Sequence, residues 1–568
     1  MEARSFGARY PVTSRDALCG VSFRLMPGER VLLLGASGSG KSTLVAAICG
    51  LVPHSSYARI GGSLALFGMN TLQYQPSQLS RRAGVVFQDP DSQLTMLTVE
   101  DEVAFGLENL AVEPQQMEQR IHEALSAVGL LNERGTRVDR LSGGMKQRLV
   151  IGAILAMQPD MLVLDEPTSN LDPEGAREVA LLLRQLALSR PQTTIVLVEH
   201  RLDALVALVS RVLVLDRNGA LAVDAATDDA FGPLAATLDE LDVWLPTSTL
   251  ALRHLRSNAV QVPGALWSPE HLRGLAARNA EAARLLQLWG APQRSANTAA
   301  SAHRSAAPAV TLEDVGFAYQ AGRPVLNGVN LQLQRGEMCA LVGGNGSGKS
   351  TLAALAAGLM RPDRGRVLIE GIDSRRIGAA QIAARVGFVF QNPEHQFVTD
   401  KVFDEVAFTL RRTSLDEAEQ KQRVERTLQA LRLDGLADRN PFELSHGQKR
   451  RLSVASMLVA EKDVLIFDEP TFGQDPRALD ELLQMVQGLQ QRSVAVMIVT
   501  HDMELVYRHA DRVALLLHGR IARCDSPERL FCDDELLSSA GLELPARLEL
   551  LRQLQLLPAA VRRHEEVR

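Results

Sequence analysis

Two stretches decide the fold of this chain: VLLLGASGSGKSTL at residues 31–44 and CALVGGNGSGKSTL at residues 339–352. Each begins with an apolar run typical of a buried parallel strand and ends in a segment of helical propensity. The glycine-rich loop between them matches the pattern GxxxxGK(S/T) in full. In this order, successive backbone N–H groups can surround phosphate oxygens, and the helix N-terminus adds positive potential. We therefore predict two phosphate-binding loops rather than chance glycine-rich turns.

The lysine and the hydroxyl residues of each loop have separate expected tasks. Lys41 and Lys349 would neutralise the β and γ phosphates of ATP, and Ser42 and Ser350 would bind Mg²⁺. The complete predicted loops are Gly35, Ala36, Ser37, Gly38, Ser39, Gly40, Lys41, Ser42 and Thr43, and Gly343, Gly344, Asn345, Gly346, Ser347, Gly348, Lys349, Ser350 and Thr351.

Four further motifs follow each loop in the same order. They are FQDP around Gln88, LSGGMKQR from Leu141, VLDEP around Asp165 and VEH ending at His200, and then FQNP around Gln391, LSHGQKRR from Leu444, IFDEP around Asp468 and VTH ending at His501. The glutamine and the serine of the third motif are 54 residues apart in both copies (88 to 142, 391 to 445), and that serine and the aspartate are 23 apart (142 to 165, 445 to 468). Matched spacings predict a fused pair of doubly wound α/β nucleotide-binding domains.

Paired carboxylates end an apolar strand in each half. Asp165 and Asp468 are expected to hold Mg²⁺ through its water shell. The next residues, Glu166 and Glu469, point to another face of the strand and are placed to polarise an attacking water. A merely solvated strand end is the alternative for an isolated Asp-Glu pair, and the neighbouring phosphate loop argues against it.

A glutamine and a histidine complete each predicted site. Gln88 and Gln391 follow apolar runs and precede proline-containing turns, where an amide can reach Mg²⁺ or the water from a mobile loop. An ordinary surface glutamine is the alternative. His200 and His501 each close a strand, and their repetition favours a γ-phosphate contact over a histidine that only satisfies a strand end.

LSGGMKQR and LSHGQKRR resemble the signature motif of ATP-binding cassette (ABC) ATPases. The resemblance implies two P-loop NTPase domains, each with a RecA-like core, an antiparallel β subdomain and a helical signature subdomain. It also implies intramolecular pairing of the two domains, in which each signature covers the ATP held by the other domain's loop. The signature residues concerned are Ser142, Gly143, Gly144, Ser445, His446 and Gly447. Tyr10 and Tyr319 resemble the aromatic that stacks on adenine, and core packing is their alternative.

Two departures from the family pattern are visible. His446 stands where glycine is usual, and Met145 stands where glutamine is usual. Because a histidine needs space and can become charged near neutral pH, the site formed by Lys41 and the second signature is expected to be the slower one. Both glutamates and both loops are intact, so we predict hydrolysis at both sites.

Three stretches resemble the ATPases of energy-coupling factor (ECF) transporters: residues 87–109, 390–410 and 50–68. This resemblance implies a peripheral protein on the cytoplasmic face of the cell membrane. There it would sit under an integral membrane T component, and a separate S component would capture a vitamin, a vitamin precursor or a metal ion. ATP-driven closure would power translocation by those chains.

The stretch from Phe87 to Asn109 is a candidate docking surface. An apolar groove rimmed by carboxylates would suit an Arg-bearing amphipathic helix. An internal packing face of the helical subdomain is the alternative. The residues that would form the groove and its rim are Pro90, Leu94, Met96, Leu97, Glu100, Asp101 and Glu102.

Composition restricts the remaining possibilities. The net charge of −6 over 568 residues gives no basic field, so we expect no nucleic-acid partner. The five scattered cysteines fit a reducing cytosol, and no apolar run approaches the roughly 18 residues of a membrane span. The start MEARSFGARYP lacks a signal-peptide core. The expected organisation is 1–232 (first ATPase domain), 233–293 (helical extension), 294–308 (flexible linker), 309–535 (second ATPase domain) and 536–568 (C-terminal helical extension).

Three rival functions fit these residues less well. A soluble twin-cassette ATPase acting on ribosomes or nucleic acid would predict a long basic linker or an iron–sulfur cysteine cluster, and residues 233–308 supply neither. A fused sugar-importer ATPase often lacks one catalytic glutamate, whereas both are present here. A scaffold with dead sites conflicts with two intact phosphate loops.

Overall fold

The computed structural model describes residues 1–11, 15–168, 171, 173–262, 267–292, 307–320, 322–413, 415–471, 475–558 and 561. Contacts within the chain divide it into two compact units, Met1–Ala282 and Ala283–Arg568. The division falls inside helix α12 (Ala280–Trp289). The predicted linker, 294–308, lies outside the described residues except for Ala307 and Pro308.

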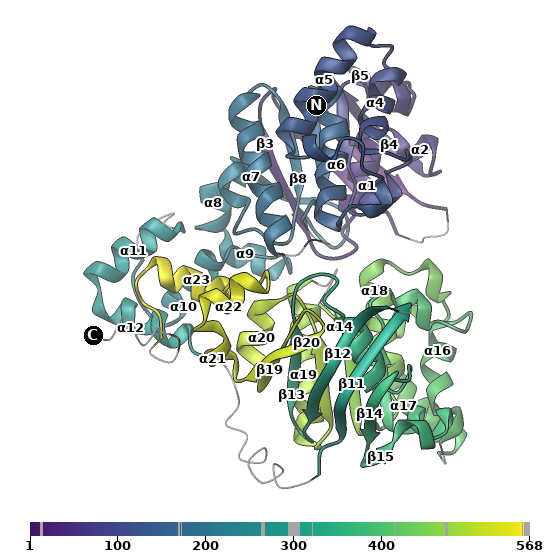
Figure 1. The fold of residues 1–568 in the computed structure, drawn as a ribbon. Coiled ribbons are helices and arrows are strands. Elements are labelled where there is room, and N and C mark those ends of the chain that lie inside the picture. The colour runs from purple at the N-terminus through teal and green to yellow at the C-terminus, as the bar shows by residue number, and fades with distance from the viewer. Residues whose placement is uncertain are drawn as a thin grey trace. The chain divides into compact units, whose positions relative to one another are not determined.

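A six-stranded, mostly parallel sheet forms the centre of the first unit (Figure 1). Its strand order is β10-β9-β3-β8-β7-β6, so β3, which leads into the phosphate loop, lies between β8 and β9. Every residue of β7 and β8 is buried, as the apolar runs MLVLD and TIVLV predict. The bounds are β3 Arg30–Gly35, β6 Ala83–Val86, β7 Met161–Asp165, β8 Thr194–Val198, β9 Arg211–Leu215 and β10 Leu221–Ala226.

The second unit repeats this sheet in the same order, β20-β19-β13-β18-β17-β16. Only the edge strand β20 pairs in the antiparallel sense. The bounds are β13 Met338–Val342, β16 Val386–Val389, β17 Val464–Asp468, β18 Ala495–Val499, β19 Arg512–Leu517 and β20 Arg520–Asp525.

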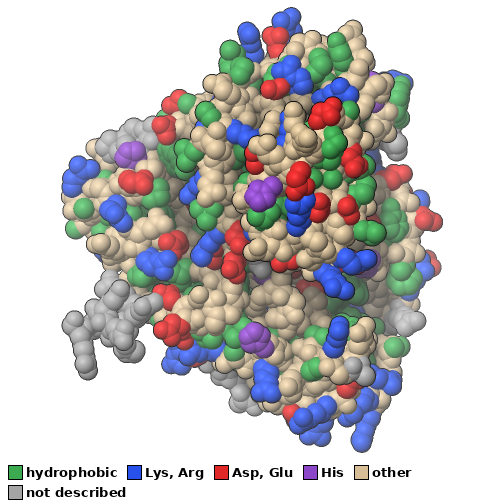
Figure 2. Space-filling view, turned by 45° about the horizontal axis from the view of Figure 1, so that its top comes forward, with side chains coloured by type: hydrophobic (Ala, Val, Ile, Leu, Met, Phe, Trp, Pro, Cys, Tyr) green, Lys and Arg blue, Asp and Glu red, His purple; other side chains and the backbone are tan. Residues whose placement is uncertain are grey.

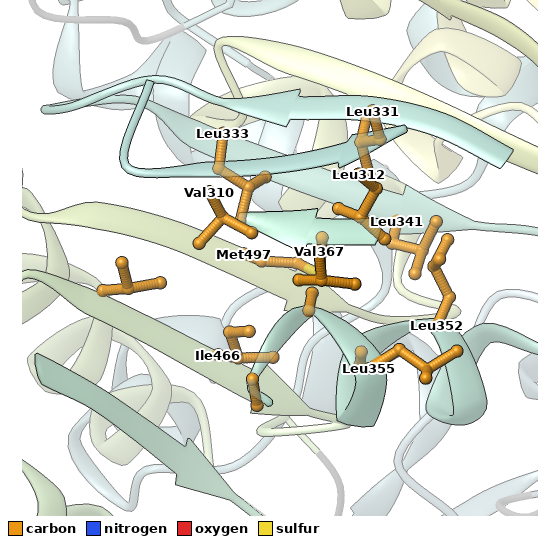
Figure 3. Close-up of a cluster of buried hydrophobic side chains, with 14 of the residues drawn as sticks. Val310, Leu312, Leu331, Leu333, Leu341, Leu352, Leu355, Val367, Ile466 and Met497 are labelled. Atoms are coloured by element: carbon orange, nitrogen blue, oxygen red, sulfur yellow. The ribbon is translucent and has the colours of Figure 1, made fainter. Parts of the chain in front are cut away.

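Each unit also contains a four-stranded antiparallel sheet, β2-β1-β4-β5 in the first and β12-β11-β14-β15 in the second. The main core of the second unit lies between its two sheets and helix α14 (Lys349–Ala356). Figure 3 shows side chains of all three, including Leu312, Leu341 and Leu352, turned toward one another. The strands are β1 Glu2–Arg9, β2 Leu18–Arg24, β4 Arg59–Leu66, β5 Met69–Asn70, β11 Val310–Gln320, β12 Arg323–Leu333, β14 Arg364–Ile369 and β15 Ile372–Asp373.

Helices that precede and include the signature pack together as a third layer of each unit (Figure 1). In the first unit, α4 and α5 both pack on the signature helix α6, and in the second α16 and α17 pack on α18. This bears out the predicted fold class: each unit has a mostly parallel core, an antiparallel sheet and a helical signature layer. The bounds are α4 Val99–Asn109, α5 Pro114–Ala127, α6 Gly143–Ala156, α16 Val402–Phe408, α17 Glu417–Ala430 and α18 His446–Leu458.

Other helices lie between the strands along the chain. They include α1 Lys41–Ile48, α2 Leu51–His54, α3 Pro76–Leu79 and α7 Pro173–Ser189 in the first unit, and α15 Ala379–Arg385, α19 Pro476–Gln491 and α20 Met503–His509 in the second. On the face drawn in Figure 2, acidic and basic side chains are interspersed.

A group of short helices directly follows the last strand of each six-stranded sheet. They are α8 Thr227–Phe231, α9 Ala235–Glu240 and α10 Thr247–Ser257 in the first unit, and α21 Pro527–Phe531, α22 Asp534–Ser539 and α23 Ala546–Gln553 in the second. Just before α11 (Pro269–Arg278), the Trp267 ring packs on Phe231, with 5.5 Å between ring centroids. At the end of α12, Trp289 lies under the guanidinium of Arg547, 4.1 Å from it.

The core of the second unit provides a test of the fold. Leu341 is fully buried among the side chains of Figure 3, so Leu341→Ala removes contacts that the close-packed neighbours cannot replace. We expect a loss of about 2–5 kcal/mol in the free energy of unfolding, measured by urea titration of the full chain. Leu359→Ala is the matched control because Leu359 is 53% exposed. Equal midpoints for the two variants would contradict this core.

Candidate nucleotide sites of the two halves

Each phosphate loop begins where a central strand ends and closes on a glycine in the left-handed region. Gly40 has φ of 94° and Gly348 has φ of 100°, and each directly precedes its helix. A Cβ at Gly40 would lie 2.2 Å from the carbonyl oxygen of Ala17. Both the backbone conformation and the neighbouring backbone therefore require glycine there.

The loop lysines point back into their own loops. The Nζ of Lys41 donates hydrogen bonds to the carbonyl oxygens of Gly35 at 2.7 Å and Ala36 at 3.1 Å. Lys349 makes the equivalent two bonds, each of 2.9 Å, to the first two residues of its loop. Both lysines are buried, so each ammonium group is held at the place where the sequence predicts the phosphates.

The predicted magnesium ligands of the second half lie together. Ser350 donates a side-chain hydrogen bond to Asp468, and the Oδ1 atom of Asp468 is buried without a partner in the described part of the chain. Burial raises the pKa of Asp468 above its usual value, and the Lys349 charge opposes the rise. A buried carboxylate oxygen beside a hydroxyl fits a site for a hard divalent cation.

Asp165 occupies the same position in the first half. Burial raises its pKa to about 6, and the neighbouring Glu166 charge adds to the rise. The positive charge of Lys41 opposes it. A bound cation would favour the ionised carboxylate, since an opposite charge lowers the pKa of an acid.

The structure brings three predicted catalytic residues of the first half together. Glu166 follows β7 with φ of 51°, and its Oε2 atom accepts a hydrogen bond from Nε2 of Gln88 at 2.8 Å. Its Oε1 atom lies 2.8 Å from Nε2 of His200. The glutamine loop, the strand-end glutamate and the histidine loop thus meet at one carboxylate.

The second half brings only two of its three residues together. His501 places Nε2 3.4 Å from Oε1 of Glu469, and its backbone N–H donates to Oε2 at 3.4 Å. Gln391 is exposed, and within the described residues no hydrogen bond joins it to Glu469. The two halves therefore hold equivalent glutamates in different ways.

Both predicted adenine-stacking tyrosines hydrogen-bond to their own phosphate loop. The hydroxyl of Tyr10 lies 3.4 Å from Oγ1 of Thr43, and that of Tyr319 lies 3.1 Å from Oγ1 of Thr351. Tyr10 is half-buried and packs on the core, whereas Tyr319 is 65% exposed. An exposed ring anchored by its hydroxyl leaves a face for an aromatic base to stack on.

The signature serines are exposed N-caps of α6 and α18. Ser142 accepts a hydrogen bond from the backbone N–H of Met145, and Ser445 accepts one from Gln448. Gly143 and Gly144 form the first turn of α6, and His446 and Gly447 that of α18. The side chain of His446 lies outside the described part of the structure. The caps leave first-turn N–H groups available for an anion.

Glu199, which lies directly before His200, is a functional residue that the sequence motifs did not indicate. Its side chain is 1% exposed, and burial raises its pKa. Oε2 accepts from the hydroxyl and the N–H of Thr168, at 2.7 and 3.3 Å. Oε1 accepts from the backbone N–H groups of His200 and Arg201, at 2.8 and 3.1 Å. Glu199 therefore joins the histidine loop to the segment after Glu166; the only sequence signal was the difference between VEH and VTH.

One residue of the predicted acidic rim, Glu102, is buried inside the protein and does not lie at the surface. Glu102 is 6% exposed, because its carboxylate accepts hydrogen bonds from the backbone N–H groups of Thr95 and Met96, both at 2.8 Å. The prediction that Glu102 faces a partner was wrong. Glu405 makes the same contacts in the second half, to Val398 and Thr399. This carboxylate shapes the loop that follows the glutamine motif.

Two segments of the chain, residues 18–169 and 326–472, match the family model described as ABC transporter. The chain belongs to this family. It is an ABC ATPase that binds and hydrolyses ATP, with the cassette present twice.

Relatives match along almost the whole chain. The putative HMP/thiamine import ATP-binding protein YkoD of Bacillus subtilis (strain 168) is 38% identical over 531 residues, which cover 93% of this chain and 92% of that protein. A putative ABC transporter ATP-binding protein of Methanosarcina acetivorans is 38% identical over 556 residues, 96% of this chain and 89% of that one. The solved structure of cbiO1 from Clostridium perfringens, part of the ABC transporter complex cbiONQ, is 33% identical, covers 43% of this chain and 99% of its own, and has a TM-score of 0.37.

Glu199 can be tested by substitution. Glu199→Ala leaves the N–H groups of His200 and Arg201 without their acceptor, so we expect a loss of about 1–3 kcal/mol in the free energy of unfolding. We also expect lower ATP turnover in a Glu469→Gln background, where hydrolysis reports on Glu166. Thr500→Ala is the control: Thr500 accepts a single backbone N–H, from Asp502 at 3.0 Å. Wild-type stability and turnover in Glu199→Ala would rule out this bracing role.

Proposed function

We propose that this chain is the ATPase subunit of an ECF-type importer that powers uptake of a small micronutrient: a vitamin, a vitamin precursor or a metal ion. In this proposal it binds a membrane T component and acts with a substrate-binding S component, as a peripheral protein on the cytoplasmic face of the membrane. None of the helices that the structure describes is long and apolar enough to cross a membrane.

The observation that carries the proposal is the likeness of the whole chain to a relative named for import. The match to the putative HMP/thiamine import protein spans 93% of this chain, so it includes both cassettes and residues between them. Such coverage supports a common arrangement of two fused ATPases, and an importer is the activity that the relative's name states. HMP or thiamine is accordingly the first substrate class to test.

A surface after each glutamine motif supports docking on another protein. Leu97 is 66% exposed and Phe105 is 42% exposed in the first unit, and Val398 and Phe408 are 63% and 46% exposed in the second. The buried carboxylates of Glu102 and Glu405 hold the loops in shape beneath them. Leu97 and Val398 lie on the braced loops, and Phe105 and Phe408 lie on the helices that follow, α4 and α16. Exposed apolar side chains on such a surface are suited to receive an apolar helix face.

The acidic side chains beside this surface differ in whether they are already paired with an arginine of the chain. Glu100 forms an ion pair with Arg134, at 2.7 Å between Oε2 and Nε. Asp101 is exposed; its carboxylate accepts a hydrogen bond from the Thr98 hydroxyl at 2.5 Å, and its backbone N–H donates to the same hydroxyl, but the described residues give it no ion pair. Of the predicted rim, Asp101 is therefore the carboxylate we propose to meet a basic partner residue.

The site residues receive proposed roles from their geometry. The backbone of the two loops and their lysines would bind the phosphates of ATP. Ser42, Asp165 and Gln88, and their counterparts Ser350, Asp468 and Gln391, would hold Mg²⁺, which neutralises the developing charge. We further propose that the signature of each domain completes the site of the other. This pairing and the boundaries 1–232 and 309–535 follow from the family resemblance.

The strand-end glutamates can be tested separately. Each carboxylate would polarise the attacking water, so Glu166→Gln and Glu469→Gln should each lower steady-state ATP turnover, and the double variant should lose about 10²-fold or more. Turnover is measured by phosphate release with MgATP, and binding of a fluorescent ATP analogue checks that nucleotide still binds. A fully active single variant would show that its site is dispensable.

Docking can be tested by copurification from membranes. We expect the wild-type chain to retain integral membrane proteins, and Leu97→Asp with Phe105→Asp to lose them, because charges replace apolar contacts. Leu188→Asp is the matched control, since Leu188 is 80% exposed on α7. Copurification of ribosomes without a membrane protein would overturn the importer proposal. Unchanged retention by the double variant would reject this docking surface alone.

A further inference from the structure

The buried face of the signature helix differs between the two halves. Five residues after the signature serine, α6 carries Gln147 and α18 carries Arg450. Both side chains lie inside the protein, at 2% and 0% exposure. A neutral amide in one half thus stands where the other half has a buried cation.

Arg450 connects the two loops that carry catalytic candidates of the second half. Its Nη1 atom donates to the carbonyl oxygen of Phe390 at 2.5 Å, and Nη2 donates to that of Glu469 at 2.8 Å. Phe390 directly precedes Gln391. One planar guanidinium therefore spans the base of the glutamine loop and the backbone of the strand-end glutamate.

The charge of Arg450 is retained despite its burial. Burial lowers the pKa of its guanidinium to about 10, and the carboxylates of Glu469 and Asp468 oppose that shift. The side chain therefore stays protonated at neutral pH. Its Nη1 and Nη2 atoms are hydrogen-bonded, whereas its Nε atom is buried without a hydrogen-bond partner in the described part of the chain. A buried charge depends on the acceptors that it has, so the loops that supply these two carbonyl oxygens are held to it in turn.

Among the described residues of the first half, no side chain of α6 makes such a connection. The Nε2 atom of Gln147 is buried without a hydrogen-bond partner in the described part of the chain. Instead, the side chain of Gln88 donates directly to Glu166 at 2.8 Å. The glutamine loop and the glutamate are thus joined through side chains in the first half and through a third residue in the second.

We propose that Arg450 is a positioning residue for ATP hydrolysis in the second half. It fixes the backbone of Glu469 relative to the base of the Gln391 loop, so the glutamate carboxylate stays oriented while the Gln391 side chain is free to approach a nucleotide. Glu469 has φ of 51°, as Glu166 has, so the costly backbone conformation is common to both halves and the difference lies in what joins the glutamate to the glutamine loop. This inference rests on the proposed catalytic role of Glu469.

The test measures hydrolysis by the second half alone. In a Glu166→Gln background, Arg450→Gln reproduces the amide of the first half. We expect kcat to fall by about 10- to 100-fold while KM for ATP changes by less than about 2-fold, because orientation and not nucleotide binding is lost. Arg450→Lys keeps the charge, but a single ammonium group cannot span both carbonyl oxygens as a planar guanidinium does. The kcat of Arg450→Lys should therefore lie between that of the Glu166→Gln parent and that of Arg450→Gln.

A matched control uses the first half. In a Glu469→Gln background, Gln147→Ala should leave kcat within about 2-fold of its parent, because the Nε2 atom has no hydrogen bond to lose within the described residues. An equal loss of kcat in Gln147→Ala and Arg450→Gln would overturn the proposal, since packing of the helix would then explain both. So would an unchanged kcat in Arg450→Gln, or a loss of kcat that follows a rise in KM.

Stability and the role of Glu469 are followed in parallel. Thermal unfolding reports whether each variant is folded. If Arg450→Gln does not fold, Arg450→Lys provides the test. A lowered kcat at unchanged KM in Arg450→Lys would then support the proposal, and an unchanged kcat would contradict it. Adding Glu469→Gln to the Glu166→Gln background tests the underlying assumption. If that change has no effect, the proposed role of Glu469 fails; if it abolishes turnover while Arg450→Gln does not lower kcat, only the role of Arg450 fails.

Discussion

The carboxyl edge of a buried parallel sheet is the constraint on which the rest of each half depends. β3, β7 and β8 pair in parallel, so the phosphate loop, the Asp165–Glu166 pair and the histidine loop all leave the sheet at the same edge. Because these strands are buried, backbone hydrogen bonds and packing fix where each loop starts. The short side chains of the site can then meet within hydrogen-bonding distance, although they are far apart in the sequence.

On this common frame, the two halves secure the loops of the candidate site with different residues. In the first, Glu199 binds the backbone of the histidine loop, and Gln88 bonds directly to Glu166. In the second, a threonine replaces that glutamate, and Arg450 joins the glutamine loop to Glu469. Glu199 accepts four hydrogen bonds, and Arg450 donates to two carbonyl oxygens. Both are buried charged groups that hold loops beside the site in a fixed geometry.

The sequence alone predicted most of the fold, and it supplied the candidate residues of the site. Repeated motifs at equal spacing, apolar runs ending in carboxylates and glycine-rich loops are local signals, and the structure bears out the fold class that they indicate. Of the apolar residues predicted to form a docking groove, Leu97 is exposed, whereas Pro90 is buried and cannot line an open groove. Glu102 was misplaced because a carboxylate that caps backbone N–H groups from within looks the same in sequence as one that faces water.

Tertiary structure decided which groups meet. The sequence by itself determined that the chain has two cassettes, where each phosphate loop lies and which residues could act, because these follow from local pattern and backbone conformation. It could not show that Glu199 is buried, that Gln391 stands apart from Glu469 or that Arg450 spans two loops. Those facts depend on contacts between residues up to 60 positions apart, and only packing of the strands and helices brings them together.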